Sequence, residues 1–199
     1  MILGDMYMQE LKERIVKEGK VLPGNIIKVD GFLNHRIDTG LLSRIAEEFG
    51  KYFDMDNVSM ILTAEASGIA LATAVAMHYH KPMIFAKKAK SDNIEGGLYQ
   101  SDIYSYTYKK KVTLLVSKEW LSSSDKVLII DDFMANGEAM RGLCDIVTAA
   151  GATLVGIGCA VEKGFQGGGD RLRAAGVNLK SLAIIESAEP GHIVFRDDD

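Results

Sequence analysis

The stretch KVLIIDDFMANGEAMRGLCDIVTAA occupies residues 126–150. Its apolar run Val127–Ile130 carries branched side chains, which predicts a strand buried on both faces, as in a parallel sheet. Asp131 and Asp132 follow directly, and a short loop spans 133–139. Beyond the loop, apolar residues recur at helical spacing until a glycine ends the helix. The stretch therefore predicts a strand, an acidic tip, a tight loop and a helix.

The loop of this unit suits a phosphorylated sugar. Ligands of open α/β sheets bind outside the carboxyl ends of the strands, and the N-terminus of the following helix offers free N–H groups to a phosphate. Asn136 and Gly137 allow the backbone to turn with a positive φ. Asp131 and Asp132 would repel a phosphate, so we expect them to face hydroxyl groups, as in a ribose diol, or a bound Mg²⁺. An ordinary turn with solvated aspartates has the same spacing, and the spacing alone does not separate the two.

The residues on either side continue an alternation of strands and helices. Asp38 is placed to cap one helix, and Trp120 and Leu121 are expected to pack. The order of elements predicts an α/β fold, a twisted and mostly parallel sheet with helices on both faces. No repeat, linker or boundary interrupts residues 1–199, which predicts a single domain. The expected helices span 9–18, 39–49, 69–78 and 170–175, and the expected strands 26–29, 58–62, 83–86, 112–116, 153–161, 179–185 and 193–195.

Composition narrows the functional classes. Of 199 residues, 47% are hydrophobic and 25% charged, as in an ordinary globular protein. The net charge of −4 supplies no basic field for a nucleic acid. Cys144 and Cys159 fall inside expected elements and are interpreted as buried thiols, which fits a reducing cytoplasm. We find no signal peptide and no apolar stretch that would span a bilayer, so the expectation is a cytoplasmic protein that binds neither nucleic acid nor membrane.

Two further segments are candidates for binding an anion. The loop 63–68 is made mostly of small residues and precedes a helix, so it offers free amides, although a plain connection has the same composition. Lys87 and Lys88 follow the strand 83–86, where a charge run is usually a solvated face.

VLIIDDFMANGEA, residues 127–139, resembles the 5-phosphoribosyl 1-diphosphate (PRPP) motif of type I phosphoribosyltransferases. The flanking stretches GFLNHRID, SGIA, FAKK, IYSYT and VEKGFQ resemble the bacterial xanthine phosphoribosyltransferases of that family in the same order. The resemblance therefore covers nearly the whole chain. The sequence departs from the pattern at Asn136 and Ala139, where many members have Thr, so two hydroxyl contacts to phosphate are missing. It departs also at Ala135, where some relatives carry an Asp proposed as a base.

This resemblance implies a type I phosphoribosyltransferase-like sheet, a small hood formed by about 20–38 and the C-terminal strands, and a mobile two-stranded flap over about 91–111. Tyr104, Tyr106 and Tyr108 would share one face of that flap. The implied reaction transfers 5-phosphoribosyl from PRPP to xanthine and gives xanthosine 5′-monophosphate and diphosphate, in purine salvage. The implied cofactor is Mg²⁺ with PRPP, and the implied assembly is a homodimer.

Two alternatives stay open. The first is an enzyme that acts on another purine, such as hypoxanthine, guanine or adenine. The chain would otherwise be a regulator that binds PRPP without catalysis, although such regulators carry a DNA-binding segment and the N-terminal residues here have no basic patch.

The resemblance also assigns the site residues. Asp131 and Asp132 hold the ribose hydroxyls and act in catalysis. No residue is assigned as a metal ligand of the protein itself. On the residues alone, Asn34 is a turn residue and Lys163 a solvated lysine at a strand end, and only the resemblance favours base contacts. The PRPP residues are Ser67, Gly68, Lys87, Lys88, Ala135, Asn136, Gly137, Glu138 and Ala139, and the xanthine residues are Ile27, Asn34, Lys163 and Phe165.

Overall fold

The computed structural model of the chain describes residues 3–88, 97–105 and 110–196. A six-stranded sheet forms its centre, in the order β10-β9-β8-β7-β3-β4. Neighbouring strands run parallel except at one edge, where β10 pairs antiparallel with β9. The expected twisted, mostly parallel sheet is confirmed. Its strands are β3 (Met60–Ala64), β4 (Met83–Ala86), β7 (Lys126–Met134), β8 (Thr153–Lys163), β9 (Leu179–Glu189) and β10 (His192–Phe195).

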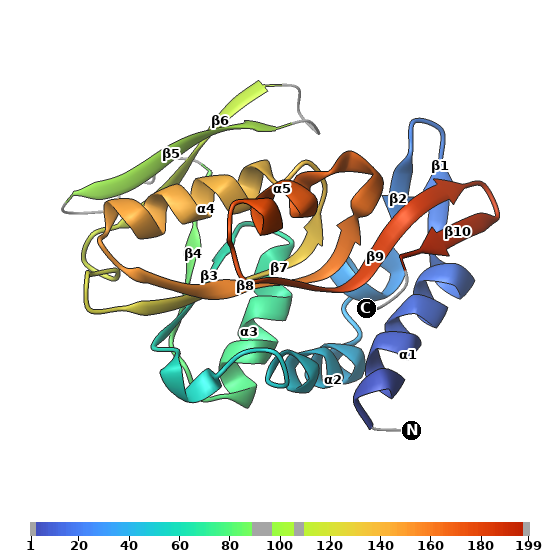
Figure 1. Cartoon of the computed structure of the whole chain (residues 1–199), viewed down its shortest axis with the longest axis horizontal. Coiled ribbons are helices and arrows are strands. Elements are labelled where there is room, and N and C mark those ends of the chain that lie inside the picture. Colours follow the sequence, from blue (N-terminus) through green and yellow to red (C-terminus); the bar gives the residue numbers. More distant parts are fainter. Residues whose placement is uncertain (1–2, 89–96, 106–109, 197–199) are drawn as a thin grey trace.

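Helices cover both faces of this sheet (Figure 1). They are α1 (Leu3–Glu18), α2 (Thr39–Phe49) and α3 (Gly68–His78) on the lower face and α4 (Glu138–Ala149) and α5 (Gly168–Ala174) on the upper face of the view. Side chains alternate along β7, so Leu128 and Ile130 pack with the lower helices and Val127 and Ile129 with α4. Two apolar clusters, one on each face, therefore hold the sheet in place.

Most of the expected helices agree closely with the structure. The helix over 39–49 has the predicted bounds, and the Asp38 carboxylate caps it by accepting the Leu41 N–H at 3.0 Å. The helix expected over 9–18 begins earlier, at Leu3. None of the helices in the described ranges is long and apolar enough to cross a membrane.

The acidic pair lies inside a strand and not after one. β7 was expected to end at Ile130, but its parallel pairing with β8 continues from Asp131 opposite Cys159 to Met134 opposite Glu162. The apolar run marks only where β7 is covered on both faces, and the strand goes on where its side chains line a cavity.

An antiparallel hairpin of β5 (Leu98–Ser105) and β6 (Lys110–Ser117) lies over α4 (Figure 1). The strand expected over 112–116 is thus the second arm of this hairpin, which spans 98–117, whereas a two-stranded flap was expected over about 91–111. Residues 89–96 and 106–109, with Tyr106 and Tyr108, lie outside the described residues. Ile103 is buried against α4, and the Arg141 guanidinium donates to the Asp102 carbonyl at 2.7 Å.

Several smaller elements complete the fold. β1 (Lys20–Leu22) pairs with β2 (Ile26–Lys28), and a π-helical turn, η1 (Asp30–Asn34), stands where a loop was expected. β1 and β2 lie beside the ends of β9 and β10 (Figure 1), and we call these four strands together with η1 the hood. Two 3-10 turns are η2 (Met55–Asn57) and η3 (Gly164–Gln166).

One packing prediction was wrong. Leu121 is buried as expected, but the Trp120 side chain is 61% exposed. It sits in the turn after β6, beyond the edge of the apolar cluster that takes up Leu121.

Candidate functional site

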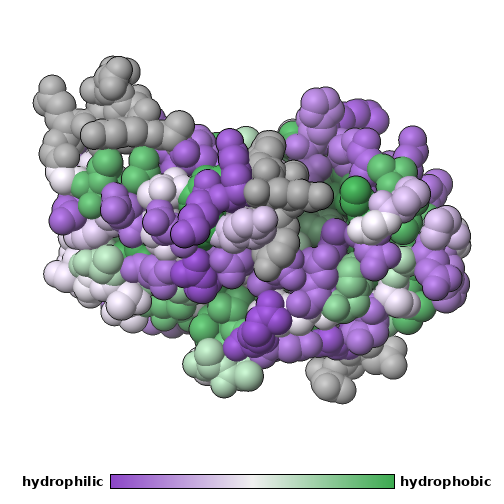
Figure 2. Space-filling model, turned by 90° about the horizontal axis from the view of Figure 1, so that it is seen from above, coloured by the Kyte–Doolittle hydropathy of each residue, from purple (hydrophilic) through white to green (hydrophobic). Residues whose placement is uncertain are grey.

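A cavity of about 220 Å³ opens at the carboxyl ends of β3 and β7, beneath the β5–β6 hairpin. Seen from above, this side of the molecule is mostly hydrophilic, with hydrophobic side chains in separate patches (Figure 2). The position is the one at which parallel α/β sheets bind ligands. The lining residues are 64, 65, 67, 88, 103, 104, 112, 131 and 133–140.

Two buried carboxylates lie next to each other in β7 at this cavity, and of the two only Asp131 lines it. Asp131 is 6% exposed and Asp132 1%. The Asp132 backbone N–H donates to Asp131 Oδ1 at 3.1 Å, and Asn34 Nδ2 donates to Asp132 Oδ2 at 2.8 Å. Burial first, and the neighbouring Asp132 charge second, raise the pKa of Asp131, while Lys88 lowers it by a smaller amount. A ligand that brings hydroxyl donors or a cation would therefore offset the repulsion between these two buried carboxylates.

The N-terminus of α3 packs directly against the same acid. A Cβ atom on Gly68 would overlap both the Asp131 carboxylate and the Thr63 hydroxyl. Thr63 Oγ1 is buried and has no hydrogen-bond partner among the described residues. Only glycine at position 68 lets the loop after β3 approach β7 this closely.

The loop Ala135–Ala139 lines the cavity over its whole length. Gly137 has a φ of 76° and is the N-cap of α4, whose first backbone N–H groups have no partner within the helix. The Glu138 carboxylate already has partners, because its Oε2 accepts from Arg141 at 3.3 Å and from the Tyr104 N–H at 3.4 Å. The loop thus has backbone N–H groups at the start of α4 from which an anion could accept hydrogen bonds, and binding of an anion there stays a prediction.

The loop after β3 is held from the side of β4. Glu65 Oε1 accepts the Lys88 backbone N–H, and the Glu65–Ala66 peptide is cis. Ser67 and Lys88 line the cavity. Lys87 is not among its lining residues, and its backbone pairs in both directions with Leu115 of β6. Of the two candidate lysines, Lys88 is the one at the cavity.

The expected base residues come together only in part. Lys163 Nζ donates to the Asn25 carbonyl at 3.0 Å and lies 5.4 Å from the centroid of the Phe133 ring. Burial lowers the pKa of Lys163. Ile27 lies in β2 and is buried in the lower apolar cluster, and Phe165, in η3, packs against that cluster. None of the four expected base residues, Ile27, Asn34, Lys163 and Phe165, lines the cavity of 220 Å³.

Sequence reasoning missed Phe133, Ile103 and Tyr104, which line the cavity. Phe133 was interpreted as part of the loop. β7 runs to Met134, so Phe133 belongs to the same strand as Asp131, and both line the cavity. The continuation of the strand beyond the apolar run was the signal that sequence reasoning missed.

Mg²⁺ fits this donor set only together with a substrate. Among the described residues, no group of three or more His, Cys, Asp or Glu side chains could hold a metal ion. Protein sites for Mg²⁺ commonly supply one or two carboxylates and leave the other positions to substrate phosphates and water. Asp131 and Asp132, buried and close to the anion loops, match that pattern.

Comparison with known proteins gave concordant results. The family profile "Phosphoribosyl transferase domain" matches residues 36–177. A xanthine phosphoribosyltransferase of Lachnoclostridium phytofermentans is 51% identical over 193 residues, which cover 96% of this chain and 100% of that protein. One of Bifidobacterium longum is 52% identical over 192 residues, with 95% and 100% covered. The crystal structure of adenine phosphoribosyltransferase from Rhodothermus marinus superposes with a TM-score of 0.73 at 20% identity and covers 91% of this chain and 99% of that one.

Proposed function

The chain belongs to the phosphoribosyltransferase family, and we propose that it transfers the 5-phosphoribosyl group of PRPP to xanthine. The products are xanthosine 5′-monophosphate and diphosphate, so the reaction salvages a purine base. The observation that carries this proposal is the near full-length identity of about one half with proteins named for that reaction. The fold neighbour acts on adenine by its name, but at 20% identity it bears on the fold alone.

In this proposal the protein acts mainly by positioning and electrostatics. Backbone donors of 135–139 bind the 5′-phosphate, and Ser67, Gly68 and Lys88 lie on the side of the diphosphate. The bond from the anomeric carbon to diphosphate breaks, and a bond to an imidazole-ring nitrogen of the base forms as that nitrogen loses its proton. Asp131 and Asp132 accept hydrogen bonds from the ribose hydroxyls, and their negative charge stabilises the positive charge that develops on the sugar. Bound with PRPP, Mg²⁺ would neutralise charge on the departing diphosphate.

The base would lie between the hood and β7. Lys163 donates to the 6-oxo group of a purine, where adenine presents a donor instead. Asn34 donates its Nδ2 to Asp132, so its Oδ1 is left to accept an N–H of the base. Phe133 lies beneath Lys163 and supplies an aromatic face, and Ile27 and Phe165 pack behind this end of the pocket.

The whole chain forms one phosphoribosyltransferase domain in this proposal, with the β5–β6 hairpin as the flap. Closure of a flap excludes water, which protects a sugar cation from hydrolysis. Docking of Ile103 and Tyr104 over the cavity supports that role.

A purine panel tests the proposal. Diphosphate release from PRPP is measured with xanthine, hypoxanthine, guanine and adenine in the presence of Mg²⁺. We expect turnover with xanthine and rejection of adenine. Equal use of adenine contradicts the base assignment, and PRPP binding without turnover on any base identifies a regulator.

We also propose a homodimer, in which Lys87 or Lys88 contributes to the diphosphate site. Light scattering at working concentration measures the assembly. A fully active monomer contradicts this part of the proposal.

A further inference from the structure

The segment that follows β8 packs against the phosphate loop. A Cβ atom added to Gly168 would lie 2.6 Å from the Asn136 carbonyl carbon and 2.7 Å from the Gly137 nitrogen, distances that no folded backbone tolerates. Arg171 Nη2 donates to the Asn136 carbonyl oxygen at 3.1 Å. Both contacts from α5 reach the backbone of the loop and not its side chains.

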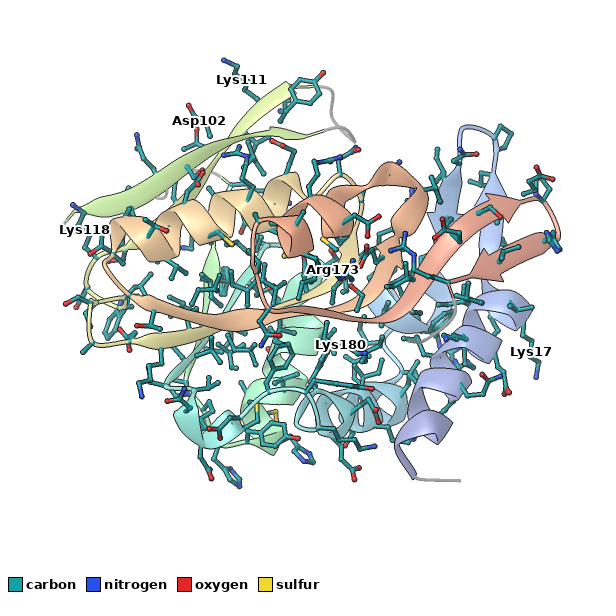
Figure 3. All side chains as sticks on the ribbon, in the orientation of Figure 1. Lys17, Asp102, Lys111, Lys118, Arg173 and Lys180 are labelled. Carbon is teal, nitrogen blue, oxygen red and sulfur yellow. The ribbon has the colours of Figure 1, made fainter. Side chains whose placement is uncertain are left out.

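A buried ion pair fixes α5 on the sheet. Glu162 in β8 is 0% exposed, and Arg173 binds both of its carboxylate oxygens, at 3.1 and 2.6 Å. Ser181 donates to the same carboxylate, and a Cβ atom on Gly169 would overlap it. Arg173 lies between α5 and the sheet (Figure 3). This geometry leaves α5 little freedom, because a two-pronged guanidinium–carboxylate pair sets both distance and orientation.

The same helix is tied to the hood. Asp170 accepts from Arg173 at 3.3 Å and from Arg196 at 2.7 Å, and Arg196 donates to Glu186 of β9 at 2.8 Å. Lys163, the proposed base contact, is the next residue after Glu162. One set of contacts therefore connects the base end of the pocket with the phosphate loop.

We propose that α5 is a brace that positions the phosphate loop for PRPP, with Gly168 and Arg171 as its positioning residues. The inference rests on the proposed function, because it takes the loop to be the 5′-phosphate site. In a trans peptide the C=O and N–H groups point in opposite directions. Arg171 holds the Asn136 carbonyl on the side of α5, so the Gly137 N–H points away from Arg171, and Gly137 lines the cavity.

Arg171→Ala tests the brace. It truncates an exposed side chain, so the fold should stay intact. Loss of one hydrogen bond should raise the Kd of PRPP about 3- to 10-fold. The KM of xanthine and kcat should change by less than about twofold, since no contact to the base or the reacting atoms is removed. Lys17→Ala is the matched control, because it removes one positive charge at the far end of the molecule on α1 (Figure 3). Its PRPP Kd should stay native.

Gly168→Ala should weaken PRPP binding more than Arg171→Ala does, because the added Cβ atom forces the backbone of the loop to move. Gly40→Ala on α2, where a Cβ atom meets only ordinary contacts, is its control. If Gly168→Ala does not fold, Arg171→Ala decides alone. An unchanged PRPP Kd in folded Arg171→Ala, or an equal loss in xanthine affinity, overturns the proposal.

Amide hydrogen exchange separates this inference from the proposed function, because it needs no PRPP. Exchange of the 136–139 amides should be faster in Arg171→Ala than in the native protein, and unchanged in Lys17→Ala. Native exchange in Arg171→Ala refutes the brace. Failure of the native protein to bind PRPP refutes the proposed function instead.

Discussion

The two ends of the proposed substrate pocket, which we assign to the phosphate and to the base, are built in opposite ways. The phosphate end consists of consecutive residues, Ala135–Ala139, and offers backbone N–H groups at the start of α4. The base end draws its side chains from separate segments, with Asn34 from η1, Phe133 from β7 and Lys163 from β8. Between them lies Asp132, which belongs to β7 and accepts from Asn34.

This difference indicates what each end tolerates. A site of backbone donors is sensitive to φ and ψ and indifferent to most side chains. A site of side chains is sensitive to a single truncation, because each group has no substitute. Substitutions at the two ends should therefore impair substrate binding in different ways.

The largest effect is expected for Gly137→Val at the phosphate end. A β-branched residue with a φ of 76° is strained, and its side chain would meet Gly168. PRPP binding by calorimetry should fall by roughly 100-fold or more while the circular dichroism spectrum stays native. Asn136→Ala is the control in the same loop, because it changes only a side chain. Native PRPP affinity in folded Gly137→Val would sink the assignment of the loop.

The next effect concerns the junction between the ends. Asp131→Asn combined with Asp132→Asn keeps the shape and removes the charge. If the carboxylates stabilise positive charge that develops on the ribose, kcat should fall by roughly 100-fold or more, and the PRPP Kd much less. Single-turnover rates and calorimetry measure the two quantities. Equal losses would mean that the acids only anchor the bound ground state.

A smaller and more selective effect is expected at the base end. Lys163→Ala removes a charged donor, so the KM of xanthine should rise roughly 10- to 100-fold. The PRPP Kd should remain native, because Lys163 lies on the other side of Asp132. Lys180→Ala, which removes a β9 lysine stacked on Tyr52, serves as the control. Native xanthine kinetics in Lys163→Ala would remove this residue from the base site.

The smallest effect is on stability. Burial and Asp132 raise the pKa of Asp131 above its usual 3.8, so the folded protein holds a proton that the unfolded chain releases. Stability therefore falls as the pH rises through the window between the usual and the raised pKa. Above that window Asp131→Asn should unfold at a higher Tm than the native protein, by about 2–4 °C for each kcal/mol gained in a chain of this size. At the acidic end of the window the two proteins should converge. A lower Tm for the variant than for the native protein at a pH above that window would contradict this account.

The strand, loop and helix over residues 126–150 were predictable because their signals are local. An apolar run, two acids, a glycine and a helical repeat are adjacent in the sequence, and each has a direct physical meaning. The strand and helix order followed from the same periodicities, and the predicted parallel sheet is confirmed.

The base end was less predictable because its contacts are distant. Nothing near Asn34 in the sequence indicates that its amide meets Asp132, 98 positions away. A helix was expected over 170–175, but the packing of α5 on the loop 135–139 depends on the ion pair of Glu162 and Arg173, from β8 and α5. Trp120 shows the converse error, since a large apolar side chain next to a buried leucine need not be buried itself.

The hood joins segments from opposite ends of the chain, and this has a consequence for biosynthesis. During translation the chain emerges from its N-terminus, so β3, β7 and α4 leave the ribosome well before β9 and β10. A nascent chain can therefore assemble the phosphate end while β1, β2 and α1 still lack the strands against which they pack. Contacts between residues so far apart in the sequence form late, and they make folding slower. The residues proposed to bind the sugar phosphate would thus be assembled before those proposed to select the base.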